Sequence, residues 1–193
     1  MRHASRILTA SILLSATLNA QGHPQTRQGF TISFGLGGGS ASFNCNGCAS
    51  SRESAGTGYL RIGGTFRPDL IVAGQTDAWT KTENGATLTA GTADFVVQWY
   101  PQVAGGFYLL GGIGFGSVST SVDTGMGTLT NNKGGVGYNA GAGYDIRLRR
   151  NFSLTPYVAF FGVSTGSNAS SLGAANTRIT AHVMAFGLGF TWH

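Results

Sequence analysis

The stretch YNAGAGYDIRL, residues 138–148, alternates between two kinds of side chain at every second position. One face carries Tyr138, Ala140, Ala142, Tyr144, Ile146 and Leu148, and the other carries Asn139, Gly141, Gly143, Asp145 and Arg147. Successive side chains of a β-strand point to opposite sides, so an alternation of period two predicts a strand. One face of this strand would contact an apolar environment, and the other would carry small and polar side chains.

The same alternation recurs before and after this stretch. It predicts further strands at 30–36, 59–66, 70–79, 87–100, 107–115, 153–162 and 184–192. Short connections at 67–69, 101–106 and 149–151 alternate with longer ones at 40–57, 81–86, 119–134 and 164–176. This order is typical of an up-and-down barrel with tight turns at one end. We therefore predict an all-β fold, an eight-stranded antiparallel barrel over residues 29–193.

The composition excludes several other classes of protein. Glycine supplies 32 of 193 residues, about 17% against a usual ~7%, and charged residues only 10% against a usual ~25%. The 12 Phe, 6 Tyr and 3 Trp argue against disorder, and glycine shows no three-residue collagen period. Glycine costs a helix about 1 kcal/mol per position relative to alanine, so a helical protein is disfavoured.

The two faces of the strands predict lipid outside the barrel. A soluble eight-stranded barrel turns its apolar face inward around a ligand, whereas small and charged side chains suit a narrow, filled interior. The inward charges are Arg61, Asp77, Asp94, Asp145 and Arg147. Aromatic residues gather near the short turns, as in a membrane-interface girdle: Phe66, Trp99, Tyr100, Phe107, Phe152, Phe190 and Trp192. We therefore expect a transmembrane barrel.

Residues 1–20 have the three parts of a secretory signal peptide. Basic Arg2, His3 and Arg6 precede an apolar segment over 7–18, which is too short for a spanning helix of ~20 residues. We expect cleavage after Ala20 and a periplasmic segment over 21–28. Losing Arg2 and Arg6 lowers the formal net charge from +5 to +3. That charge is too weak and scattered to predict nucleic-acid binding.

The chain after residue 20 resembles the small bacterial outer-membrane β-barrel proteins of the OmpA/OmpX type. The most specific part is GLGFTWH, residues 187–193, where Gly187, Phe190 and Trp192 match the carboxy-terminal signal that the barrel-assembly machinery reads. The stretch from Tyr100 to Gly114 also resembles the central turn and strand of such barrels. The chain departs from the family by placing His193 after the terminal aromatic residue.

The resemblance implies a location in the bacterial outer membrane and contact with its lipid and lipopolysaccharide. It implies no single activity, because the family includes structural, adhesive and lipid-modifying members. We expect a monomeric barrel with a structural or surface-interaction role, no catalysis, no cofactor and no metal. The alternatives are an outer-leaflet lipid-modifying enzyme and, third, a narrow pore for small solutes.

Cys45 and Cys48 form a CNGC motif in the first long connection. Nothing nearby predicts the helix N-terminus that would activate a redox thiol, and no His or further Cys is close enough to complete a zinc site. We expect a disulfide, which would contribute about 2 kcal/mol by closing so small a ring. A redox or metal role is the alternative.

The inward charges are expected to form a network that fills the interior, because an isolated buried charge costs several kcal/mol. Arg61 is expected to pair with Asp94 or Asp77 near the middle, and Arg147 to lie nearer the short turns. A gated ion path or a buried catalytic pair is the alternative.

His182 lies on the outward face, ten residues before Trp192. Ten tilted residues span about 25 Å, the height of a barrel's apolar band, so we expect His182 at the outer interface. With Arg178, it is a candidate contact for lipopolysaccharide phosphates. A lipid hydrolase would need a serine and an acid beside this histidine, and the next outward residue is Met184.

Overall fold

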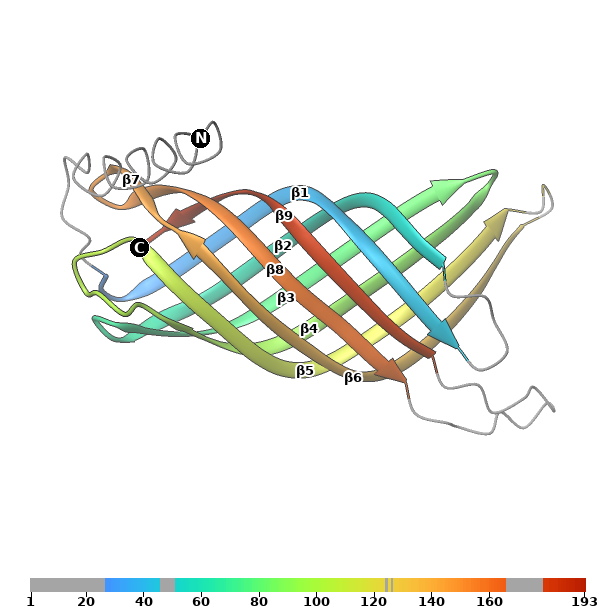
Figure 1. The fold of residues 1–193 in the computed structure, drawn as a ribbon, viewed down its shortest axis with the longest axis horizontal. Coiled ribbons are helices and arrows are strands. Elements are labelled where there is room, and N and C mark those ends of the chain that lie inside the picture. Colours follow the sequence, from blue (N-terminus) through green and yellow to red (C-terminus); the bar gives the residue numbers. More distant parts are fainter. Residues whose placement is uncertain (1–26, 46–50, 124, 126, 166–178) are drawn as a thin grey trace, which may run out of the picture.

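The computed structural model describes residues 27–45, 51–123, 125, 127–165 and 179–193. These form a closed antiparallel barrel (Figure 1). In this part of the chain, no helix is long and apolar enough to cross a bilayer. The signal peptide, residues 21–26, the Cys45–Cys48 disulfide and Arg178 are predictions that lie outside the described residues or their described side chains.

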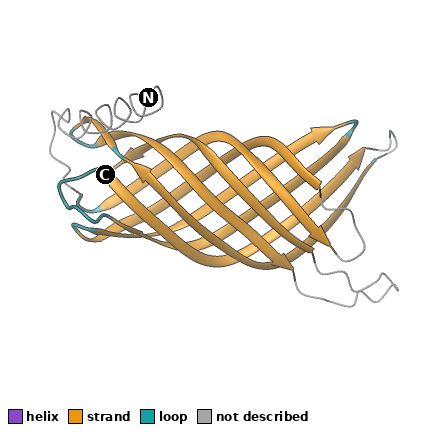
Figure 2. Ribbon diagram, viewed as in Figure 1, coloured by secondary structure: helices purple, strands orange, loops and turns teal. Residues whose placement is uncertain are grey.

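The strands follow one another around the barrel, and β1 pairs with β9 to close it (Figure 2). β6 and β7 both pair with β8, so β7 is the continuation of β6 after a short interruption. Counted together, they make the barrel eight-stranded, as predicted. The strands are β1 (Phe30–Cys45), β2 (Ser51–Arg67), β3 (Leu70–Glu83), β4 (Ala86–Trp99), β5 (Phe107–Asp123), β6 (Thr128–Tyr144), β7 (Ile146–Arg149), β8 (Phe152–Thr165) and β9 (Ile179–Trp192).

The stretch 138–148 keeps its predicted faces but is not one continuous strand. Asp145 lies between β6 and β7, and its backbone N–H donates to the carbonyl of Gly106, 2.9 Å away in the β4–β5 connection. Asn139, Asp145 and Arg147 remain buried on the inner face. The sequence offers no signal for this break, since the alternation continues through it.

Three of the four longer connections are shorter than predicted, and the fourth, at 164–176, lies almost wholly outside the described residues. The segment at 81–86 contains only a two-residue turn, Asn84-Gly85, whose φ angles of 50° and 75° match the left-handed geometry of a tight Asn-Gly hairpin. Most of 119–134 belongs to β5 and β6, and much of 40–57 belongs to β1 and β2. Their Ser/Thr content favours loops, but here hydroxyls meet across strands, as between Thr82 and Thr87 at 3.0 Å.

An apolar belt surrounds the barrel near its short-turn end, the end with the β2–β3, β4–β5 and β7–β8 connections. Soluble monomers rarely expose a contiguous apolar patch above a few hundred Å², so this belt is suited to contact with lipid or another apolar partner. Toward the opposite end, called the far end, outward positions become polar. The belt includes Phe30, Leu36, Leu60, Ile62, Phe66, Phe95, Ile113, Phe115, Val158, Phe160, Met184, Phe186, Leu188 and Trp192.

The interior is filled with side chains. At the far end, Trp79 packs in an apolar cluster with Phe161, Val163 and Val183, and its indole N–H donates to the Gly39 carbonyl at 3.2 Å. Ile71, Ala73, Val96, Tyr100, Tyr108 and Leu110 form a second cluster toward the short turns. A cavity beside Arg61 and Tyr108 measures about 10 Å³, room for a single water.

Glycine on the inner wall makes this packing feasible. A Cβ on Gly143 would stand 2.4 Å from the Tyr108 hydroxyl, and one on Gly63 would stand 2.2 Å from the Val72 carbonyl oxygen. Real Cβ atoms do not approach so closely. At Gly143 a large inner side chain occupies space that the glycine leaves free, and at Gly63 the backbone of the neighbouring strand comes too close for a Cβ.

Candidate functional site

All five predicted interior charges lie inside the barrel, and none is more than 5% exposed. They separate into two groups along the barrel axis. Arg61, Asp77 and Asp94 form the mid-lumen group, while Asp145 and Arg147 lie near the short turns.

The expected direct ion pair of Arg61 with Asp94 or Asp77 is absent from the described residues, and Arg61 instead donates hydrogen bonds to two glutamine side chains, an arrangement called the Arg61 relay. Arg61 Nε donates to Gln75 Oε1 at 2.6 Å, and Arg61 Nη1 donates to Gln98 Oε1 at 2.7 Å. Gln75 Nε2 in turn donates to both carboxylate oxygens of Asp77, at 3.0 and 2.8 Å. Glutamine can do this because its amide both accepts and donates hydrogen bonds. Arg61 and Asp77 are thus joined by hydrogen bonds through the neutral Gln75 side chain and not by a direct ion pair.

Asp94 is the exception in this network. It is 4% exposed, and within the described chain neither carboxylate oxygen accepts a hydrogen bond of ordinary geometry. The register places it beside Gly114 of β5, which in turn pairs with Gly137 of β6. A Cβ on either glycine would stand 2.9 Å from Asp94 Oδ1. The two glycines therefore create the space that the carboxylate occupies.

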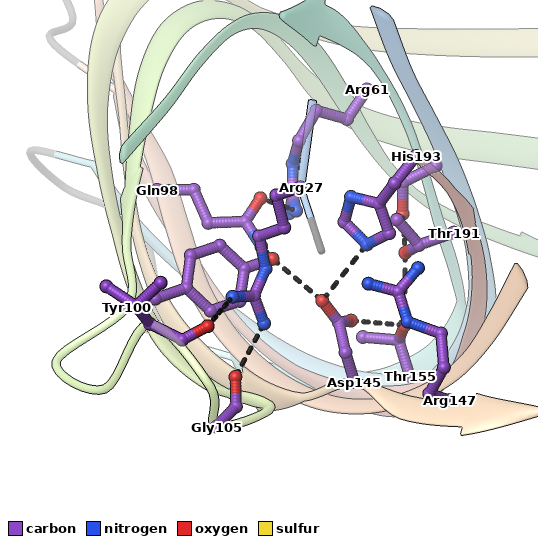
Figure 3. A network of polar contacts seen from close by, with 12 residues as sticks. Arg27, Arg61, Gln98, Tyr100, Gly105, Asp145, Arg147, Thr155, Thr191 and His193 are labelled. Atoms are coloured by element: carbon purple, nitrogen blue, oxygen red, sulfur yellow. Dashed lines mark hydrogen bonds and ion pairs between the residues drawn. The ribbon is translucent and has the colours of Figure 1, made fainter. Parts of the chain in front are cut away.

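Asp145 is the centre of a second network, near the short turns (Figure 3). Its carboxylate accepts hydrogen bonds from the Tyr100 hydroxyl at 2.7 Å and from Thr155 Oγ1 at 2.8 Å. His193 Nε2 lies 3.4 Å from Asp145 Oδ2, and both side chains are almost fully buried. Gln98 Nε2 donates to the Tyr100 hydroxyl at 2.5 Å, which links this network to Arg61.

Arg27 enters the mouth of the barrel at the same end. Its guanidinium lies over the Tyr100 ring, 3.4 Å from the centroid, and donates to the carbonyls of Val103 at 2.9 Å and Gly105 at 2.6 Å. Arg27 is only 2% exposed, although it falls in the predicted periplasmic segment 21–28. It therefore closes the interior by joining the residues before β1 to the β4–β5 connection (Figure 3).

Three residues that fill this end of the barrel were not predicted as interior residues from the sequence: Tyr100, Arg27 and His193. Tyr100 was expected in the outer aromatic girdle and is instead fully buried; it shares the inward parity of Asp94 and Gln98, a signal that could have placed it. Arg27 and His193 lie just outside the strands, where alternation gives no information.

The far-end rim carries an ion cluster beyond the apolar belt. Lys81 Nζ lies 2.5 Å from Glu53 Oε2 and 2.6 Å from Glu83 Oε2. The hydrogen bonds to Glu53 and Glu83 raise the pKa of Lys81, and the hydrogen bond from Lys81 lowers the pKa of Glu83. All three side chains are partly exposed, so the cluster contributes little to stability.

His182 lies on the outer wall, just beyond the belt residue Met184. The Tyr138 hydroxyl and His182 Nδ1 share a hydrogen bond, and the Phe160 ring stacks on the imidazole at 5.8 Å and 15°. In the β1–β9 register Ser42 is directly opposite His182, and Arg52 of β2 is opposite Ser42. We call Arg52, Ser42, His182 and Tyr138 the outer polar row.

Among the described residues, no group of three or more His, Cys, Asp or Glu is suited to hold a metal ion. The register likewise puts no carboxylate of the described chain in the outer polar row.

The residues of the expected assembly signal lie along the β1–β9 seam. A Cβ on Gly187 would stand 2.2 Å from the Leu36 carbonyl oxygen, so only glycine allows this close approach of the two strands. The Phe190 ring stacks on Phe152 at 5.6 Å and 8°, and Trp192 lies 4.6 Å from the same ring. Recognition of these residues by assembly machinery stays a prediction.

Comparison with solved structures identifies the fold. Ail, the attachment invasion locus protein of Yersinia pestis, superposes with a TM-score of 0.54 and 14% identity, over 84% of this chain and 99% of Ail. Neisserial surface protein A gives a TM-score of 0.55 and 14% identity, over 84% of this chain and 96% of that protein. No family model and no curated protein matches the sequence. The chain thus has the fold of the small eight-stranded outer-membrane barrels, as the OmpA/OmpX resemblance implied.

Proposed function

We propose that this chain is an integral protein of the bacterial outer membrane with a structural or surface-interaction role and no catalytic activity. The apolar belt carries this proposal, because a surface with Phe30, Ile113 and Phe115 each more than 60% exposed needs lipid around it. The likeness in fold to Ail and Neisserial surface protein A supports it.

The filled interior argues against a pore. The cluster around Trp79 occupies the far end, and Arg27 with Tyr100 occupies the mouth at the short turns. Between them lie the Arg61 relay and the Asp145 network. An eight-stranded barrel of this kind has room for side chains but not for an aqueous channel.

The outer polar row is a suitable contact for lipid headgroups. It lies where the outward residues of β9 change from apolar Met184 to polar His182, the level expected for headgroups. Arg52 supplies a fixed positive charge, and Ser42 and His182 supply hydrogen-bonding groups beside it. We infer that phosphates of lipopolysaccharide bind here, with Arg178 as a further candidate.

Membrane fractionation with a heat-modifiable gel assay tests the location. We expect the protein in the outer-membrane fraction, with an unheated band that migrates differently from the boiled one. Recovery in the soluble periplasmic fraction would refute the proposal. Binding of purified barrel to lipopolysaccharide micelles tests the headgroup contact, with Arg52→Ala weakening it and exposed Arg149→Ala at the opposite end as the matched control.

A second candidate function follows from the position of Ser42 opposite His182. A serine next to a histidine is the core of a hydrolase site, and the outer wall faces lipid esters. The described part of the outer polar row offers Tyr138 rather than an acid to orient the histidine. We therefore expect no ester hydrolysis in lipid micelles beyond that of Ser42→Ala, and a serine-dependent rate would favour the enzyme.

A further inference from the structure

We propose that the middle of the lumen binds one small monovalent cation of the sodium or potassium class, held by Asp94 and Asn139. This site goes beyond the proposed membrane role, and it is built from residues inside the barrel that the outer surface does not use.

The first argument is the local charge. Asp77 and Asp94 each contribute a negative charge to the mid-lumen group, and Arg61 contributes the positive one. With two carboxylates and one guanidinium in this group, one carboxylate lacks a compensating charge at this level. An uncompensated buried charge costs several kcal/mol in a protein interior. A single positive charge beside Asp94 removes that cost.

The second argument is a set of unused oxygen acceptors. Both oxygens of Asp94 and Oδ1 of Asn139 are buried without a hydrogen bond in the described chain. Asn139 Nδ2 donates to Asp77 Oδ2 at 2.5 Å, which turns Oδ1 of that amide away from Asp77. The Thr92 hydroxyl lies on the same inner face as Asp94 and close to it, without a hydrogen bond of ordinary geometry.

The third argument is space. Asp94 lies over Gly114 and Gly137, and a Cβ on either glycine would crowd its carboxylate at 2.9 Å. Gly137 precedes Asn139 by two residues on the inner face of β6, so the carboxylate and the amide oxygen share one part of the lumen. The two glycines therefore let the Asp94 carboxylate lie across β5 and β6, on the inner face that also carries Asn139.

The chemistry of the donors selects the ligand. Carboxylate, amide and hydroxyl oxygens are hard ligands that suit alkali and alkaline-earth cations. A net charge of one favours a monovalent ion over a divalent one. A buried water could complete the hydrogen bonds but would leave the charge uncompensated. The rival arrangement is a proton on Asp94, which makes the carboxyl group neutral.

The ion would be enclosed on both sides. The Trp79 cluster separates the mid-lumen group from the far end, and Tyr100 with Arg27 separates it from the short-turn mouth. Exchange with bulk solvent should therefore be slow, and the ion must be offered while the barrel folds.

The experiment refolds the full chain into detergent micelles in sodium, potassium or choline chloride at equal ionic strength. We expect thermal unfolding midpoints a few degrees higher in sodium or potassium than in choline, saturating with salt concentration. Asp94→Asn should abolish this difference, whereas Asp123→Asn, on the exposed end of β5, should keep it.

Two results would overturn the proposal. One is the same midpoint for the unaltered chain in all three salts, a comparison that needs no variant to fold. The other is an infrared band of a protonated carboxylic acid that Asp94→Asn removes, because the proton would then supply the charge.

Discussion

Replacing Asp145 by alanine tests whether the network near the short turns holds the barrel together. The variant removes the acceptor for the Tyr100 hydroxyl and Thr155 Oγ1, and with it the carboxylate that lies 3.4 Å from His193 Nε2. A buried donor left without a partner costs about 1–3 kcal/mol, and truncating one partner of a buried charge network costs about 3–5 kcal/mol. We expect the free energy of unfolding to fall by about 3–5 kcal/mol.

The assay is urea unfolding of the refolded protein in lipid vesicles, followed by tryptophan fluorescence and by the heat-modifiable gel band. Asp69→Ala is the matched control, because the Arg67–Asp69 pair of 2.9 Å is exposed and should contribute only about 0–1 kcal/mol. If the two alanine variants lose similar stability, the argument from burial is wrong. A double-mutant cycle with Tyr100→Phe measures the hydroxyl–carboxylate bond, and strict additivity would show that this contact contributes nothing.

Three further predictions test other parts of the barrel. Trp79→Ala should lower the free energy of unfolding by about 3–5 kcal/mol in the same assay, and Trp79→Phe by clearly less, because the phenyl ring refills most of the cavity. Gly85→Ala should cost about 1 kcal/mol or more, since its φ of 75° strains any side chain; Gly111→Ala, where a Cβ meets open space, is the control and should be near neutral. NMR titration of Glu83 should give a pKa below the ordinary glutamate value, and Lys81→Gln should raise it. The stabilisation from this pair is present above the ordinary glutamate pKa and is lost as pH falls through the lowered one, so an unchanged titration in the variant would contradict the ion pair.

The strand pattern and the inner charges could be predicted from the sequence because both follow from parity. In a barrel wall every residue faces either the lipid or the lumen, so large apolar side chains at alternate positions also identify the opposite face. The burial of Arg61, Asp94 and Asp145 follows from this rule alone.

The remaining features depend on how neighbouring strands are aligned and how far their side chains reach. The alternation of residues along one strand carries no information about either. The indirect contact between Arg61 and Asp77 requires the reach of Gln75, and the position of Ser42 opposite His182 requires the β1–β9 register. The sequence underestimates strand length because Ser and Thr are common both in loops and in strands that extend beyond the belt. In these strands their hydroxyls bond across to the neighbouring strand, as those of Ser121 and Thr130 do at 3.1 Å. Composition could not distinguish these two outcomes.

The residues around Asp145 come from distant parts of the chain. Arg27 precedes the first strand, Tyr100 and Asp145 lie in the middle, and His193 follows the last strand. The β1–β9 pairing brings the residues just before β1 and just after β9 to the same end of the barrel, beside Asp145. We therefore expect the full network to form only after β1 and β9 pair, whereas the bonds from Tyr100 and Thr155 to Asp145 can form before that closure.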